Sequence, residues 1–177
     1  MRLTFEKERT IKRAVFALLV LLTALFQHTK GAFPTIGGAA AWLMVPLLSA
    51  IALQESSVAA MAFGVFGGLL WDVASPAADG YFAIMFCILT FVSSTLASFL
   101  LQRNLPTCLL VTGVWLCLFA LTHWLFFVVL RGYDAAGMLL LRRYLPSMLY
   151  TFCLTPLYYF LVAAVSAPAK RKSVRRV

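Results

Sequence analysis

Residues 104–130 read NLPTCLLVTGVWLCLFALTHWLFFVVL and contain no Asp, Glu, Lys or Arg. A helix needs roughly 20 mostly apolar residues to cross a hydrocarbon core about 30 Å thick. This run exceeds that length before it meets its flanking charges, Arg103 and Arg131. It therefore predicts a transmembrane helix.

Further charge-free runs flank this segment on both sides, at 14–29, 31–54, 56–71, 80–102 and 144–169. We expect an all-α integral membrane protein with six transmembrane helices, at about 12–29, 38–54, 57–74, 80–101, 106–130 and 145–166. The third also fits a bent segment, or a re-entrant one paired with the second, because it contains three glycines and Asp72.

The composition supports a membrane protein, and the distribution of charge orients it. Apolar residues make up 63% of the 177 residues and charged residues only 12%, whereas a soluble domain has about 25% charged residues. Basic residues gather at both ends, which divides the chain into a basic N-terminal tail (1–13), a membrane domain (14–166) and a basic C-terminal tail (167–177). Because cytoplasmic segments are enriched in Lys and Arg, both termini are expected in the cytoplasm and residues 131–143 outside.

The short predicted connections exclude several classes of function. No segment outside the membrane is long enough to bury a core of its own, which excludes a soluble catalytic or nucleotide-binding domain. The four cysteines lack paired spacing with histidine or carboxylate, so no metal, cofactor or disulfide framework is expected. The tails are short and flank apolar helices, so we expect them to contact anionic membrane lipid and no nucleic acid; the alternative is contact with a cytoplasmic protein.

A stripe of small residues leads to a carboxylate in the third predicted helix. Ala60, Gly64, Gly68 and Asp72 recur every fourth residue and therefore share one helix face. Small residues at this spacing let helices approach closely within a membrane, so we expect the stripe to pack against a helix of this chain or of a partner. A carboxylate at membrane depth usually faces protein or water. The alternative is an interfacial Asp72 that ends the helix at the outer surface.

A turn-rich loop follows this stripe. Residues 67–72 read GGLLWD, a short Ser-Pro loop follows, and Gly80-Tyr81 opens the next helix. Asp79 lies near the N-terminus of that helix, where the unpaired amides and the helix dipole favour a negative charge.

The last predicted helix carries a second characteristic pattern. It begins LPSMLY, with Pro146 and Tyr150, and continues as LTPLYY, with Pro156. Pro146 is expected in the first turn, where a missing N–H costs little, and Pro156 inside the helix. Together with the GGLLWD run and its Gly-Tyr sequel, these segments resemble the rod shape-determining protein MreD family.

The resemblance implies a non-enzymatic scaffold in the inner (cytoplasmic) membrane of a bacterium. Such a protein belongs to the elongation (rod) complex and controls cell shape by linking MreC to the peptidoglycan synthesis machinery. The implied partners are the periplasmic scaffold MreC first, and the wall synthase of the rod complex and the actin homologue MreB less directly. The implied fold is similar to the substrate-binding subunits of energy-coupling-factor transporters, but no small-molecule substrate is expected.

A small intramembrane enzyme is one alternative function. It would need two carboxylates close enough to share a proton or a water, and Asp72, Asp79 and Glu55 are the acids within or next to the predicted helices of the membrane domain. Glu55 is predicted on the opposite side of the membrane from the other two. His28 and His123 have no obvious carboxylate partner nearby in sequence.

A solute-binding membrane subunit of the vitamin-transporter kind is the other alternative. It would need polar groups that converge on a pocket near the outer face. The candidates are Ser93, Ser94, Ser98, Thr122 and His123. Serine and threonine also form hydrogen bonds between membrane helices, and that structural interpretation is preferred.

Overall fold

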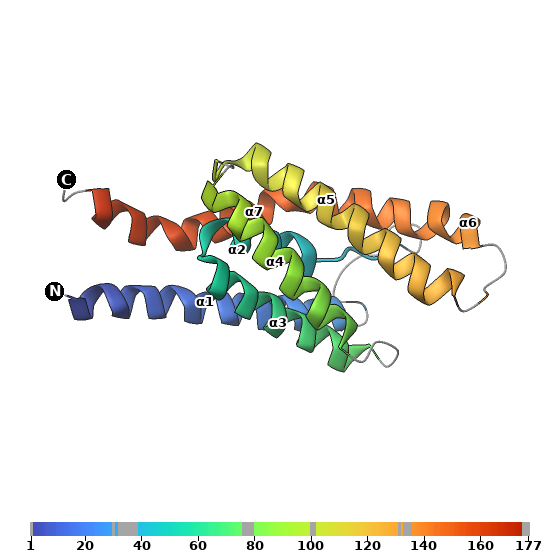
Figure 1. Ribbon diagram of the computed structural model, residues 1–177, viewed down its shortest axis with the longest axis horizontal. Helices are drawn as coiled ribbons and strands as arrows, with labels where there is room; N and C mark the ends of the chain where they lie inside the picture. The colour runs from blue at the N-terminus through green and yellow to red at the C-terminus, as the bar shows by residue number, and fades with distance from the viewer. Residues whose placement is uncertain are drawn as a thin grey trace.

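All the secondary-structure elements formed by the described residues are helices (Figure 1). The computed structural model describes residues 2–29, 31, 39–75, 80–99, 102–130, 132 and 136–174. In chain order the elements are α1 (Arg2–His28), α2 (Met44–Gln54), α3 (Ser57–Ala74), α4 (Tyr81–Phe99), α5 (Leu105–Trp124), the π-helical η1 (Leu125–Val129), α6 (Ala136–Leu139), the π-helical η2 (Leu140–Tyr144) and α7 (Leu145–Val174).

Within the described residues, five helical runs are long and apolar enough to cross a membrane: Glu8–His28, Ser57–Ala74, Tyr81–Phe99, Leu105–Val129 and Gly137–Ala167. Each of them contains most of one predicted helix. This agreement confirms the all-α class and the multi-pass membrane character that the charge-free runs predict.

Both ends of the chain lie at the same end of the helical bundle (Figure 1). We call this the terminal end, and we call the opposite end, where α3 and η1 finish, the distal end. α1 begins at Arg2 and α7 finishes at Val174, so helix continues into both of the basic segments expected to be tails. Under the predicted orientation the terminal end faces the cytoplasm and the distal end faces outside.

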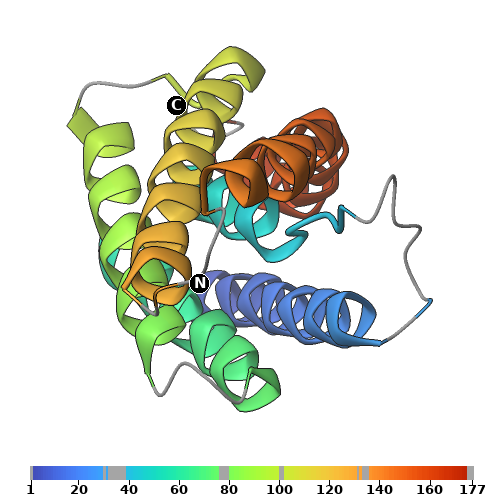
Figure 2. The same cartoon turned by 90° about the vertical axis from the view of Figure 1, so that its right-hand side faces the viewer.

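The second predicted helix is shorter than expected and lies at the centre of the bundle (Figure 2). The prediction placed it at 38–54, whereas α2 covers Met44–Gln54, about 16 Å at 1.5 Å per residue. All eleven of its residues are buried, and α1, α3, α4, α5 and α7 surround it. A helix that is apolar on every side is stable when other elements cover it in this way.

Pro46 accounts for the position at which α2 begins. A proline has no N–H to donate, which costs little only in the first turn of a helix, and α2 starts two residues before Pro46. Backbone N–H groups just before Pro46 donate to side chains of other helices. The Trp42 N–H donates to Thr151 Oγ1 at 2.9 Å, and the Met44 N–H donates to Gln27 Oε1 at 3.0 Å.

Despite its length, α2 runs beside most of the apolar part of α1. Met44 at its start bonds to Gln27, and Glu55 just after its end pairs with Lys12 and Arg13. From Arg13 to Gln27, α1 rises about 21 Å. The two elements are therefore linked near both ends of this stretch, which fixes α2 lengthwise in the bundle.

The last membrane helix begins earlier than predicted, at Ala136 instead of 145, because α6, η2 and α7 follow one another without a break. The expected connection over 131–143 is therefore partly helical. In the π-helical turn the Leu145 N–H bonds to the Leu140 carbonyl, five residues back. Pro146 follows this turn, so it is not in the first turn of the continuous helical run. In an ordinary helix its ring would clash with the carbonyl four residues back, and the π-helical turn directly before it changes the hydrogen bonding there.

Candidate functional site

The small-residue stripe of α3 packs against α4. A Cβ atom built on Gly64 would lie 2.5 Å from the Phe86 carbonyl oxygen, and one built on Gly68 would lie 2.5 Å from the Phe82 carbonyl oxygen. Backbone atoms cannot move aside as side chains do, so the two helices approach this closely only because both positions are glycine. Ala60 begins the stripe and is fully buried.

Asp72 ends the stripe and caps the N-terminus of α4. Its two carboxylate oxygens accept the Phe82 N–H at 3.1 Å and the Ala83 N–H at 3.0 Å. The first amides of a helix have no acceptor within the helix, and they carry the positive end of its dipole. A carboxylate from α3 thus satisfies two amides of α4, and Asp72 faces protein.

The chain enters α4 through a glycine in a conformation that other residues rarely adopt. Gly80 has φ of +81°, in the left-handed region, directly before α4 begins at Tyr81. Its carbonyl accepts the Ile84 N–H at 3.1 Å and so starts the hydrogen bonding of the helix. Asp79, which the sequence places at the same helix start, lies outside the described residues.

We call the contact between the end of α3 and the start of α4 the α3–α4 joint. A cavity of about 460 Å³ opens beside this joint, toward the distal end of the bundle. We call it the distal pocket. It is lined by Ala40, Trp42, Trp71, Ala74, Ser75, Phe82, Phe119, His123, Phe127, Leu139, Arg143, Tyr144 and Ser147. Trp71 precedes the capping carboxylate in the chain, and its ring stacks on Phe82 with centroids 4.9 Å apart. The α3–α4 joint therefore builds one wall of the pocket.

The remaining walls of the distal pocket bring together residues far apart in sequence. The Trp42 ring lies 4.9 Å from Phe119, and the His123 ring stacks on Phe127 at 4.6 Å. His123 Nδ1 and the Tyr144 hydroxyl are hydrogen-bonded at 2.7 Å. Among the described residues that line the pocket, none is acidic and one, Arg143, is permanently charged.

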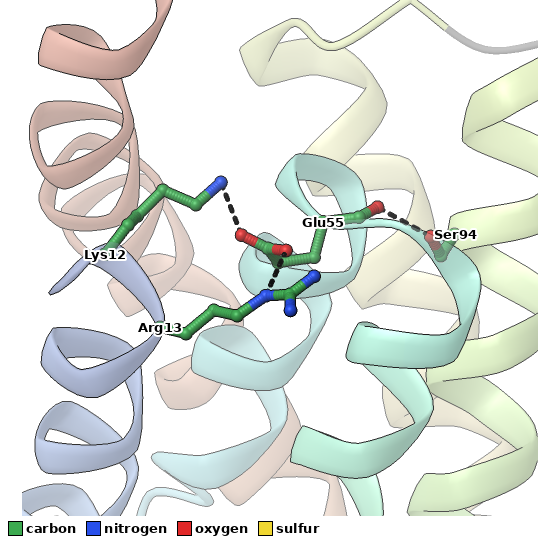
Figure 3. Close-up of polar contacts among 4 residues, drawn as sticks. All are labelled: Lys12, Arg13, Glu55 and Ser94. Carbon is green, nitrogen blue, oxygen red and sulfur yellow. Dashed lines mark hydrogen bonds and ion pairs between the residues drawn. The ribbon is translucent and has the colours of Figure 1, made fainter. Parts of the chain in front are cut away.

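A cluster of charged residues at the terminal end was not anticipated from the sequence. Glu55 follows α2 and is 5% exposed; its carboxylate pairs with Lys12 and, at 3.5 Å, with Arg13 of α1 (Figure 3). Its backbone carbonyl accepts the Ser94 hydroxyl of α4 at 2.9 Å. Two features of the sequence could have indicated this cluster. Glu55 is a single charge between two charge-free runs, and it is predicted on the same side of the membrane as Lys12 and Arg13.

Of the polar residues proposed for a solute site, His123 lines the distal pocket and the hydroxyl residues do not. Ser93 accepts the Trp115 Nε1–H at 2.8 Å, and Ser98 donates to the Ser94 carbonyl at 2.8 Å. Thr122 donates to the Leu118 carbonyl and accepts the Tyr81 hydroxyl, both at 2.7 Å. Their hydrogen bonds hold helices together or stay within one helix.

Asp72 and Glu55, the acids of the membrane domain that the structure describes, do not form a pair. Asp72 lies in the last turn of α3 and Glu55 lies just before its first residue, which separates them by roughly 25 Å along the helix. His28 instead packs edge-on against Trp71, with ring centroids 5.8 Å apart. Within the described residues, no three His, Cys, Asp or Glu side chains gather where they could hold a metal ion.

The motif residues Tyr150 and Pro156 lie along α7 and do not line the pocket, whereas Ser147 of the same motif does. Tyr150 and Pro156 are half-buried on this helix, with Pro156 inside it as predicted.

Comparison of the chain with family models, with curated proteins and with solved structures found no match. The functional argument therefore rests on the residues and their geometry.

Proposed function

We propose that this chain is a non-enzymatic scaffold of the bacterial elongation complex, similar in role to the MreD proteins that its sequence resembles. The observation that carries the proposal is the role of the GGLLWD run, and of the Gly-Tyr pair that follows it, in the contact between α3 and α4. Gly68 permits close packing, Asp72 caps α4 and Gly80 makes the turn. Because both Asp72 oxygens accept backbone amides, the motif serves to order two helices, as suits a protein that holds partners.

Contacts within the membrane are the main route to partners in this proposal. The distal connections at 29–43, 75–80 and 130–135 each have fewer than the roughly 20–30 residues per partner found in a standard interface of roughly 800 Å² per partner. The flanks of the bundle are apolar instead, as on α5, where Leu110, Val114 and Leu118 are 63%, 51% and 43% exposed. We therefore assign the membrane-spanning part of MreC to the helix flanks, and the wall synthase and MreB to less direct contacts.

Depletion in the native bacterium, combined with a pull-down, tests the proposal. Loss of the protein should round the cells, and the tagged protein should retain MreC from mild detergent. Re-expression of the parent chain should restore rods, whereas Gly68→Leu should not, because its side chain would overlap the α4 backbone. Rod-shaped growth after depletion, with no MreC retained, would contradict the scaffold function.

The distal pocket favours a second candidate, a solute-binding membrane subunit of the vitamin-transporter kind. Its volume of about 460 Å³ is within the range of roughly 300–1,000 Å³ typical of small-molecule sites. Mass spectrometry of the purified protein discriminates between the two candidates. A tightly held solute together with normal rods after depletion supports the transporter subunit and opposes the scaffold.

A further inference from the structure

We propose that the distal pocket binds a small planar aromatic molecule that carries an anionic group. This inference goes beyond the scaffold, which does not require a ligand, and it deepens the second candidate, on which it rests for any role in transport. Three features of the pocket carry it: the nature of its walls, the charge at Arg143 and the absence of an acid among the described lining residues.

The walls favour a flat ring over a flexible chain. Six of the lining side chains are Trp, Phe or Tyr, contributed by α3, α4, α5, η1, η2 and the chain before α2. Aromatic rings gain most from another ring in offset-stacked or edge-on contact, at centroid separations of about 4.5–7 Å. The wall rings already contact one another in this way, as Phe119 and His123 do at 5.9 Å, and both of these residues line the cavity.

The charge of the pocket selects an anion. Arg143 on η2 lines the pocket, and its guanidinium keeps its charge and can bind a carboxylate with two parallel hydrogen bonds. Asp72 is not part of the lining and forms no ion pair with Arg143 within 4.0 Å; its carboxylate oxygens accept the amides of Phe82 and Ala83. Ser75, Ser147 and the His123–Tyr144 pair supply further polar groups around the cavity.

The chain offers matched controls for both features. Arg142 precedes Arg143 on the same turn and is exposed, but it does not line the pocket. Phe126 precedes the wall residue Phe127 and is 51% exposed on the flank of the bundle. Substitutions at 142 and 126 therefore repeat the chemical change without altering the pocket.

The test uses full-length protein in lipid nanodiscs and three probes measured by isothermal titration, with empty nanodiscs subtracted. The probes are 2-naphthoate, its neutral analogue 2-naphthamide, and decahydro-2-naphthoate, which keeps the charge but lacks the flat ring. We expect one saturable naphthoate site per chain with a Kd below about 1 mM. Both other probes should bind roughly tenfold more weakly or not at all.

Substitutions test separately the charge of Arg143 and the aromatic walls of the pocket. Arg143→Gln should weaken naphthoate roughly tenfold and leave naphthamide unchanged, while Arg142→Gln changes neither. Phe127→Leu should weaken both aromatic probes, and Phe126→Leu neither. Failure of naphthoate to saturate, equal effects of the two arginine variants, or equal affinity for the decahydro probe would each overturn the inference. Binding is measured on the isolated protein, so its failure leaves the cell-shape test of the scaffold unaffected.

Discussion

At the scale of single residues, two carboxylates hold the ends of neighbouring helices in this protein. A charged side chain at membrane depth is costly, so it persists where other groups satisfy it. Asp72 meets this condition at the distal end through two amides of α4. Glu55 meets it at the terminal end through Lys12 and Arg13 of α1. Both acids therefore act between helices, and each can be tested by removing its oxygens.

Asp72→Ala should lower the free energy of unfolding by about 1–2 kcal/mol, because two amides of α4 lose their acceptor. Asp72→Asn keeps one carbonyl oxygen and should lose less. Thermal unfolding of the purified variants in detergent measures both effects. Equal stability of the alanine variant and the parent would show that the cap contributes nothing.

Glu55→Gln should destabilise the protein by about 1–2 kcal/mol, since it leaves Lys12 and Arg13 without their buried acid. The expected loss lies below that of a fully buried pair because the Arg13 side chain is 42% exposed. In a double-mutant cycle, Lys12→Met should cost less in the Glu55→Gln background than alone. Additive losses would contradict a direct interaction between the two side chains.

At the scale of elements, the α3–α4 pair and the buried α2 show two ways of packing helices in a membrane protein. α3 and α4 approach closely through glycines, so their backbones contact each other directly. α2 instead fills the centre with large side chains, among them Leu47, Leu48 and Ile51, all fully buried. The first arrangement depends on the absence of side-chain atoms and is disrupted by adding them. The second depends on side-chain volume and is disrupted by removing it.

Gly68→Ala should destabilise the protein by about 1–3 kcal/mol, because the new methyl group would lie 2.5 Å from the Phe82 carbonyl oxygen. Gly113→Ala is the matched control within α5. Its methyl group would meet the Phe152 ring at 3.6 Å, an ordinary contact, so its stability should equal or exceed that of the parent. Similar melting of both variants would contradict the close α3–α4 contact.

At the scale of the whole molecule, both termini lie at one end of the bundle (Figure 1). The residues that line the distal pocket lie toward the other end. The segments at the terminal end are rich in Lys and Arg, and such segments stay on the cytoplasmic side. Under the predicted orientation, a ligand of the distal pocket would arrive from outside the cell, and the basic helical extensions of α1 and α7 are expected to face anionic lipid or cytoplasmic partners.

A membrane-impermeant thiol reagent tests this orientation. Gly137→Cys lies near the distal end at an exposed position, and Gln102→Cys lies at an exposed position of the terminal end. In intact cells with a permeabilised outer membrane, the reagent should label the first variant and not the second, above the background of the native cysteines. Labelling at 102 but not at 137 would reverse the orientation.

The sequence by itself determined the class of the protein and the course of most of its membrane helices. Hydrocarbon thickness acts on each segment separately, so the run at 104–130 predicts its helix without reference to the rest of the chain. The spacing of Gly64, Gly68 and Asp72 likewise predicts a shared face, because helical periodicity is local.

Only the tertiary structure decided what that face contacts, how short α2 is and where the last helix begins. The contacts involved lie beyond the reach of a local pattern: Asp72 binds amides 10 and 11 residues later in α4, Trp42 binds Thr151, and Glu55 binds Lys12. The distal pocket is the clearest case, since its walls come from seven helical elements and the segment before α2, and its charge comes from a π-helical turn that no local pattern predicted. Local patterns report the cost of placing one segment in lipid, whereas a cavity exists only where several segments leave space between them.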